Sequence, residues 1–139
     1  MWQKTEKIVT KEVTKEQMWK LYQNIESFPI WDNGIEWTKL HGAFAVGSHY
    51  TLKPKGWPEA DIKIIHLEEF RQFDDVTHFF WAEMYGYHSL IETPEWLEIS
   101  VTMRVDGWMS WFWVMVVASG IIRELPETFK RQVEYAKTL

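Results

Sequence analysis

The last third of the chain, Gly107 to Leu139, constrains the fold more than any other stretch. It opens with fifteen residues that carry no formal charge, Trp108 to Ile122, and then becomes amphipathic. In the second half, apolar residues recur every three or four positions, the spacing of one helical face. These residues are Ile122, Leu125, Phe129, Val133 and Ala136. We interpret the whole stretch as one long helix, bent or broken near Gly120. Because its first half is almost entirely apolar, we expect the rest of the chain to cover that half on most sides.

The remainder of the chain predicts an antiparallel sheet. Residues 97–105 show the clearest strand pattern, because apolar side chains occupy every second position. Those apolar residues are Leu97, Ile99, Val101, Met103 and Val105. Further strands are predicted at 2–11, 37–40, 48–54, 60–69, 74–81 and 84–92.

Two short helices are predicted after the first strand. Thr14 and Gln17 form a capping-box pattern at the start of a helix that ends near Asn24. A second helical turn at 26–27 is expected to stop before Pro29, because the residue preceding a proline is disfavoured in the helical region. The predicted order is therefore a strand, two short helices, six strands and a long helix.

Length and composition set limits on the class of protein. A chain of 139 residues predicts a single domain, 1–139. The net charge of -5, with lysine and arginine scattered, argues against a nucleic-acid partner. The absence of cysteine excludes disulfides and thiolate metal sites and predicts a cytoplasmic protein. We expect no signal peptide, and the apolar run is short for a membrane span, so a membrane role is disfavoured.

The aromatic content is unusual, with 10 Trp, 8 Phe and 5 Tyr. Such a number favours either a pocket with flat aromatic walls or an exposed adhesive surface. If the six later strands run alternately up and down, the turns that carry Trp57, Trp81 and Trp108 lie at one end of the sheet. We therefore expect these three tryptophans to gather around one mouth between sheet and helix, or else to plug the end of the core.

Several short motifs occur together in an order that resembles one known superfamily. They are Met18-Trp-Lys-Leu-Tyr22, Phe28-Pro-Ile-Trp31, Gly42 with Val46-Gly47, His88-Ser-Leu90, Asp106-Gly107 and Leu125-Pro126. With these motifs, the whole chain resembles the polyketide cyclase/START-like superfamily, which has the helix-grip fold of birch-pollen-allergen-like proteins. The resemblance implies an α+β fold in which a curved sheet of about seven strands wraps around a kinked C-terminal helix. It also implies a cavity between sheet and helix that holds lipids, hormones or polyketides. Some members of the superfamily cyclise or dehydrate their ligand, and many only bind it, so the fold alone assigns no reaction.

Two positions depart from the pattern of similar cyclase-like sequences. Such sequences often carry an inward polar residue, commonly histidine, near the position of Val101, and a small residue at the position of Trp96. Together with the many tryptophans, these departures suggest a pocket altered by engineering or laboratory selection. This is a hypothesis.

Four residues are candidates for chemistry: His88, Tyr50, Asp32 and Glu36. His88 should point into the cavity if Leu90 does, because the two lie two residues apart in one predicted strand. A neutral imidazole there could relay a proton or fix a ligand carbonyl, although a lone inward histidine is more often structural. Tyr50 could orient a polar group of the ligand.

The two acidic candidates flank the early turn near the expected pocket. Asp32 or Glu36, buried against tryptophan, could act as a base with a raised pKa, or could be solvated or cap local backbone groups. By contrast, we interpret Asp74-Asp75 as a turn. Histidine spacing predicts no metal site, and we predict no cofactor.

We predict a hydrophobic, aromatic small-molecule ligand between the long helix and the curved sheet. The expected lining residues are Trp31, Leu52, Trp57, Ile64, Phe79, Trp81, Met84, His88, Ile99, Val101, Met103, Trp108, Phe112, Trp113 and Val116. The alternative is a cyclase, dehydratase or lyase-type enzyme, natural or designed, that uses a cavity His, Tyr, Asp or Glu for proton transfer. A third interpretation is an interaction module whose surface tryptophans form a dimer interface, so both a monomer and a homodimer are compatible with the sequence.

Overall fold

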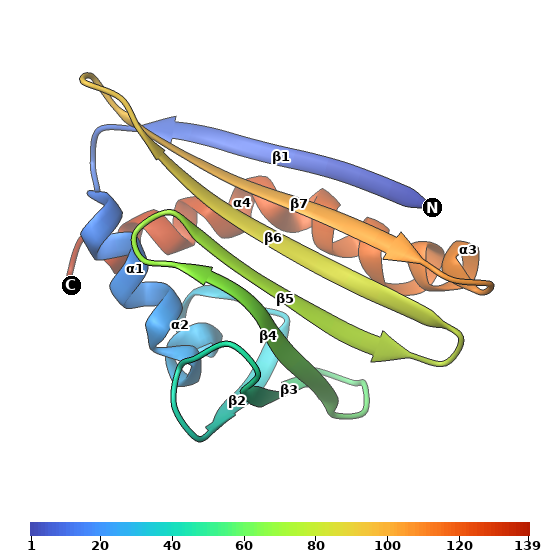
Figure 1. The fold of residues 1–139 in the computed structure, drawn as a ribbon. Coiled ribbons are helices and arrows are strands. Elements are labelled where there is room, and N and C mark those ends of the chain that lie inside the picture. The colour runs from blue at the N-terminus through green and yellow to red at the C-terminus, as the bar shows by residue number, and fades with distance from the viewer.

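The computed structural model describes residues 1–139 and has a seven-stranded antiparallel sheet packed against a long C-terminal helix (Figure 1). The strands are β1 (Trp2–Thr10), β2 (Ile35–His41), β3 (His49–Pro54), β4 (Ala60–Glu68), β5 (Gln72–Phe79), β6 (Ala82–Glu92) and β7 (Leu97–Asp106). The α-helices are α1 (Lys15–Gln23), α2 (Phe28–Trp31), α3 (Ser110–Trp113) and α4 (Ser119–Ala136). A 3₁₀ turn (Ile25–Ser27) precedes α2, and a π-helical segment (Val114–Ala118) joins α3 to α4. The predicted α+β helix-grip fold is confirmed.

The strand order is β1-β7-β6-β5-β4-β3-β2, so β2 to β7 form an up-and-down meander and β1 pairs with its last strand. In β7 every second side chain is buried, from Leu97 to Val105, as the alternation predicts. Trp2 pairs with Val105 and Thr10 with Leu97, which fixes β1 along the full length of β7. The antiparallel register then determines, strand by strand, which residues face the long helix.

The capping box at the start of α1 forms as predicted. The Gln17 amide donates to the Thr14 hydroxyl at 3.1 Å, and the Thr14 amide donates to the Gln17 side-chain oxygen at 2.9 Å. The prediction that the next helical turn stops before Pro29 is wrong, because α2 begins at Phe28 and continues to Trp31. A proline is tolerated there, since the first turn of a helix needs no donor from its amides.

The C-terminal helix is irregular at a different place from the one predicted. Its helical hydrogen bonding continues through Gly120, and the irregularity is the π-helical segment Val114–Ala118. Pro126 lies inside α4, as the resemblance implies. On the amphipathic half, Leu125, Phe129, Val133 and Ala136 are buried and Ile122 is partly buried, which confirms the predicted face.

The first half of this helix is not covered as predicted. Of the fifteen uncharged residues, only Ala118 is buried, whereas Trp108, Trp111 and Met115 are 77%, 65% and 64% exposed. Figure 1 shows α3 at the far end of the sheet, beside the end of β7, so the sheet covers only one side of it. No other element lies over its outer side, and the apolar residues there remain at the surface.

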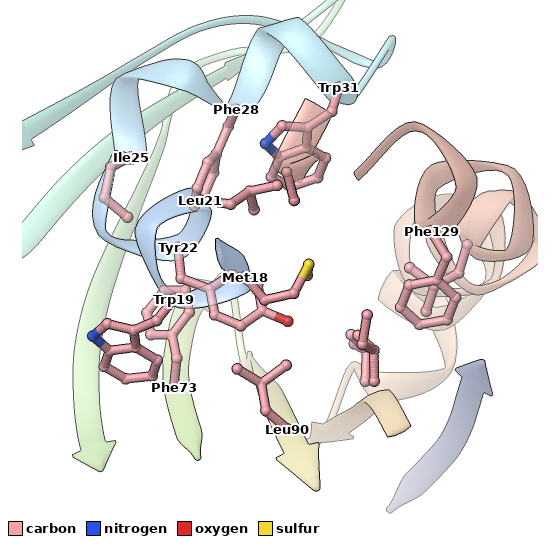
Figure 2. Close-up of a cluster of buried hydrophobic side chains, with 14 of the residues drawn as sticks. Met18, Trp19, Leu21, Tyr22, Ile25, Phe28, Trp31, Phe73, Leu90 and Phe129 are labelled. Carbon is pink, nitrogen blue, oxygen red and sulfur yellow. The ribbon is translucent and has the colours of Figure 1, made fainter. Parts of the chain in front are cut away.

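The hydrophobic core lies where α1, α2 and α4 meet the sheet. Figure 2 shows Met18 and Tyr22 from α1, Trp31 from α2 and Phe129 from α4 converging with Leu90 from β6. No helix of the protein is both long enough and apolar enough to cross a membrane.

Candidate functional site

The concave face of the sheet, which points toward the long helix, contains all the sheet residues predicted to line a pocket on strands β3 to β7. Val101 pairs with His88, and Met103 pairs with Gly86, so these positions share the face on which β7 is buried. The register extends this face across β5 and β4 to β3. The predicted residues on it are Leu52, Ile64, Phe79, Met84, His88, Ile99, Val101 and Met103.

The interior is not uniformly apolar, because a polar cluster lies on this concave face. The Tyr50 hydroxyl donates to Asp75 Oδ2 at 2.8 Å, from β3 to β5. On β6, His88 Nδ1 lies 2.7 Å from the carbonyl oxygen of Phe73. Since a carbonyl can only accept, Nδ1 carries the proton, and in the neutral ring Nε2 is an acceptor. Asp75 is only 9% exposed, so this is a buried carboxyl group beside an imidazole.

Tyr22 adds a third polar group to the cluster. Its ring centroid lies 5.6 Å from that of His88, and its side chain is 1% exposed. Figure 2 shows the side chain pointing from α1 into the interior, toward Leu90. The Tyr22 hydroxyl has no hydrogen-bond partner, which is costly for a buried polar group.

Burial perturbs the acidity of these groups. Loss of solvation raises the pKa of Asp75, while the nearby His88 and the hydrogen bond from Tyr50 lower it in part. The pKa of Tyr50 is raised well above its ordinary value, first by burial and then by the negative charge of Asp75. Burial also raises the pKa of Tyr22. Perturbed groups that converge in an interior are typical of functional sites, although structural networks show them too.

Gly86 provides the space in which two members of the cluster approach each other. A Cβ atom at this position would lie 2.8 Å from Asp75 Oδ1 and 3.3 Å from His88 Cε1. Any larger residue would therefore displace the carboxyl group or the imidazole. The glycine faces Asp75 on β5 and Met103 on β7, in the middle of the sheet.

The interpretation of Asp74-Asp75 as a turn is wrong. Both residues lie inside β5 and are buried, Asp75 on the concave face and Asp74, which pairs with Tyr87, on the other face. One signal in the sequence could have identified Asp75. It stands midway between Phe73 and Thr77, which share its face through a spacing of two.

The other predicted catalytic candidates lie outside the cluster. Glu36 is exposed and pairs with Lys53 at 3.2 Å. Asp32 follows α2 and accepts a hydrogen bond from the Gly34 amide at 2.9 Å, so it caps local backbone. Burial raises the pKa of Asp32, with the Gly34 hydrogen bond and Arg131 lowering it in part. Neither Asp32 nor Glu36 therefore belongs to the polar cluster that contains His88 and Tyr50.

The three lining residues predicted from the long helix differ in their contacts with the core. Trp113 packs against the core and stacks on Phe79 at 4.3 Å between ring centroids, and its indole donates to the Phe80 carbonyl at 2.9 Å. Phe112 and Val116 are half-buried, but they do not belong to the side chains packed against the core. The π-helical segment Val114–Ala118 changes the angular relation between the residues before it and those after it.

Trp31 is buried beside Phe28, with 5.0 Å between their ring centroids, and its indole N–H has no hydrogen-bond partner.

Trp81 and Trp108 do meet at one end of the sheet, with ring centroids 5.1 Å apart, but both are exposed. Trp57 is also exposed. These three tryptophans lie at the surface rather than on the concave face.

The surface has hollows, and two of these lie away from the space between the sheet and the long helix. One, of about 280 Å³, lies between the β5–β6 hairpin, with His78 and Glu83, and the end of β7 at Asp106. The other, of about 410 Å³, lies beside Ile30 and Arg131 on the outer side of α2 and α4. The concave face itself holds half-buried apolar side chains at Leu52, Phe79 and Met84, and fully buried ones toward α1.

Val101, one of the two departures from the cyclase-like pattern, lies directly opposite His88 on β7. Trp96 closes the β6–β7 hairpin, where its amide donates to the Thr93 hydroxyl at 3.1 Å. His88 on β6 therefore places a polar side chain beside Val101, near the position where similar cyclase-like sequences carry one. That the pocket was altered by engineering or selection stays a hypothesis.

Comparison with known proteins gives structural matches alone. No family model and no curated protein matches the sequence. A START superfamily protein from Mycobacterium smegmatis matches with a TM-score of 0.72 and 14% identity, over 96% of this chain and 97% of its own. Ara h 8.0201 matches with a TM-score of 0.72 and 15% identity, over 99% of this chain and all of its own, 100%. Norcoclaurine synthase from Thalictrum flavum, solved with dopamine and hydroxybenzaldehyde, matches with a TM-score of 0.72 and 11% identity, over 96% of this chain and 85% of its own.

These matches span nearly the whole chain, and their low identities carry information about fold rather than about residues. They agree with the sheet order, the two short helices after β1 and the long helix that packs on the concave face. The chain has the helix-grip fold of the START-like superfamily.

Proposed function

We propose that the protein binds a flat, hydrophobic small molecule between the concave face of the sheet and the long helix. The observation that carries this proposal is the composition of that face. Half-buried apolar side chains at Leu52, Phe79 and Met84 share this face with the polar cluster, in which Tyr50 and Asp75 are buried and His88 is half-buried. An apolar body and one polar group of a ligand would therefore both find suitable partners there.

Methionine makes this interior adaptable. Met18, Met84 and Met103 all contribute to it or pack against it, and the unbranched thioether side chain fills irregular space and rearranges at low cost. Ligand entry between the sheet and the long helix would require such side chains to move. Burial of flat apolar surface contributes about 25 cal/mol per Å² before the costs of ordering are subtracted.

The test is native mass spectrometry of the purified protein together with tryptophan-fluorescence titration against flat aromatic and steroid-like compounds. We expect a co-purified molecule or a saturable quench. Met84→Trp, which fills the concave face, should weaken binding by about tenfold or more. Tyr85→Trp, the neighbouring position on the convex face, is the matched control and should change affinity by about twofold at most. A quench that both variants leave intact would place binding elsewhere.

A second candidate function is proton-transfer catalysis, of the cyclase, dehydratase or lyase type. The observation that favours it is the pairing of a buried carboxyl group, Asp75, with an imidazole, His88, on adjacent strands around Gly86. A carboxyl whose pKa is raised and an imidazole with a free nitrogen are suited to general acid and base roles. The experiment that separates this function from binding is NMR detection of deuterium exchange next to the carbonyl of a bound ketone. Catalysis requires that Asp75→Asn and His88→Gln abolish the exchange, whereas a binder shows none in any variant.

A further inference from the structure

Three atoms of the polar cluster have unfilled hydrogen-bonding capacity. Asp75 Oδ2 accepts from Tyr50, but Asp75 Oδ1 makes no hydrogen bond. His88 Nδ1 is used by the Phe73 carbonyl, and Nε2 makes none. The Tyr22 hydroxyl is buried and has no partner at all.

Each of these three atoms is able to accept a hydrogen bond. A carboxylate oxygen accepts only, and in the neutral ring with a proton on Nδ1, Nε2 also accepts. The Tyr22 hydroxyl is able to accept as well as to donate. A ligand group that satisfies this set must therefore supply hydrogens, and a carbonyl or carboxylate oxygen does not.

The charged groups around Asp75 also favour a ligand group that donates hydrogen bonds. The groups that act on its carboxyl are His88 and Tyr50, which lower its pKa in part, and Asp74, which raises it, so no lysine or arginine is among them. A buried carboxylate without a lysine or arginine partner is unfavourable, and a cation brought by a ligand would offset that cost. Aromatic rings adjoin the cluster as well, since Phe73 stacks on His88 at 4.9 Å and Tyr22 lies on the same imidazole. Aromatic faces also attract cations.

We propose that this cluster binds the ammonium group of an amphiphilic amine, a compound with a protonated amine on a flat apolar body. The inference rests on the proposed function, because the apolar body would lie against Leu52, Phe79 and Met84. The ammonium N–H groups would donate to Asp75 Oδ1 and His88 Nε2, which approach each other over Gly86, a residue whose missing side chain leaves both groups in place. A primary ammonium has three donors, enough for the Tyr22 hydroxyl as a third acceptor.

The experiment is isothermal titration calorimetry at pH 7 with three probes of one shape, 2-naphthylmethylamine, 2-naphthylmethanol and 2-naphthoate. We expect the amine to bind at least tenfold more tightly than the alcohol, and the carboxylate to bind most weakly. Asp75→Asn should remove the preference for the amine and leave the affinity for the alcohol within about threefold. Asp74→Asn, one residue away on the opposite face, is the matched control and should retain the preference.

The outcomes separate this inference from the function on which it rests. Equal binding of amine and alcohol, or a preference for the carboxylate, overturns the amine assignment and leaves a hydrophobic binding site intact. Failure of all three probes to bind overturns both. If Asp75→Asn does not fold, as judged by near-ultraviolet circular dichroism, the ranking of the three probes on the wild-type protein still decides.

Discussion

The hydroxyl group of Tyr50 donates a 2.8 Å hydrogen bond to the carboxyl group of Asp75, and both residues are buried on the concave face of the sheet. The bond joins β3 to β5 across β4, so it connects strands that are not neighbours. It supplies the buried carboxyl with a partner that water would otherwise provide. Because this partner is neutral, it reduces the cost of burying the charge without removing it.

Asp75→Asn should increase stability at neutral pH. Burial raises the pKa of Asp75 in the folded protein above its ordinary value of 3.8. The folded state therefore binds more protons than the unfolded state between these two pKa values, and the free energy of unfolding falls as pH rises through that window. Each pKa unit of difference corresponds to about 1.4 kcal/mol. Urea unfolding should show the variant more stable than wild type at pH 7.

The gain from Asp75→Asn should vanish as the pH is lowered below the ordinary pKa of 3.8, to about 3, where the wild-type carboxyl is mostly protonated in both states. The groups that face this carboxyl are Tyr50, His88 and Asp74, and they are unchanged in the variant. Asp61→Asn, an exposed position, serves as control and should differ from wild type by about 1 kcal/mol at most. A stability difference for Asp75→Asn that is the same at both pH values would contradict the assignment.

Tyr50→Phe should decrease stability at pH 7 by roughly 1–3 kcal/mol, because it leaves the Asp75 carboxyl without its hydrogen-bond donor. The same change raises the pKa of Asp75 further, since the Tyr50 hydroxyl stabilises the ionised form. Following the carboxyl carbon of Asp75 by NMR during a pH titration measures this directly. A lower midpoint in the variant than in wild type would show that the hydrogen bond favours the protonated form.

The order of elements could be predicted from the sequence because local patterns determine it. The alternation in residues 97–105 and the capping box of Thr14 and Gln17 each depend on a few adjacent residues, and both are present in the structure. The concave face followed as well, since one correct register fixes every strand beside it. His88 lies on the same face as Leu90, as their two-residue spacing in one strand predicts, and its role stays a prediction.

The site itself could be predicted only in part. Asp75 becomes a candidate through its contact with Tyr50, 25 residues away, and no local pattern records such a contact. The apolar first half of the long helix misled the interpretation for a related reason. Apolar composition predicts burial, but burial also requires a partner surface, and Trp111 in α3 remains 65% exposed because none covers it.

Gly107→Ala should destabilise the protein by roughly 2 kcal/mol or more. Gly107 has a φ of +116°, and an added Cβ would lie 2.5 Å from the Trp81 carbonyl oxygen, where β7 leads into the helix. Gly120→Ala is the contrasting variant, since nothing lies within 4 Å of its Cβ position and it stands inside α4. Alanine there should stabilise by about 0.5–1 kcal/mol. Chemical unfolding of both variants is the measurement, and equal effects would mean that the exit from β7 is not rigid.

Trp113 holds the start of the long helix against the sheet, and its removal should destabilise that end of the helix. Its ring stacks on Phe79 at an angle of 10°, and its indole N–H donates to the Phe80 carbonyl. Trp113→Phe should retain the stacking, lose the hydrogen bond and cost about 1 kcal/mol, whereas Trp113→Ala should lose both and cost roughly 3 kcal/mol. Trp111→Ala, two residues away and largely exposed, should change stability by about 0.5 kcal/mol at most. Amide hydrogen exchange in residues 110–118 should accelerate in Trp113→Ala and not in Trp111→Ala. If both alanine variants behave alike, the stack on Phe79 does not hold the helix in place.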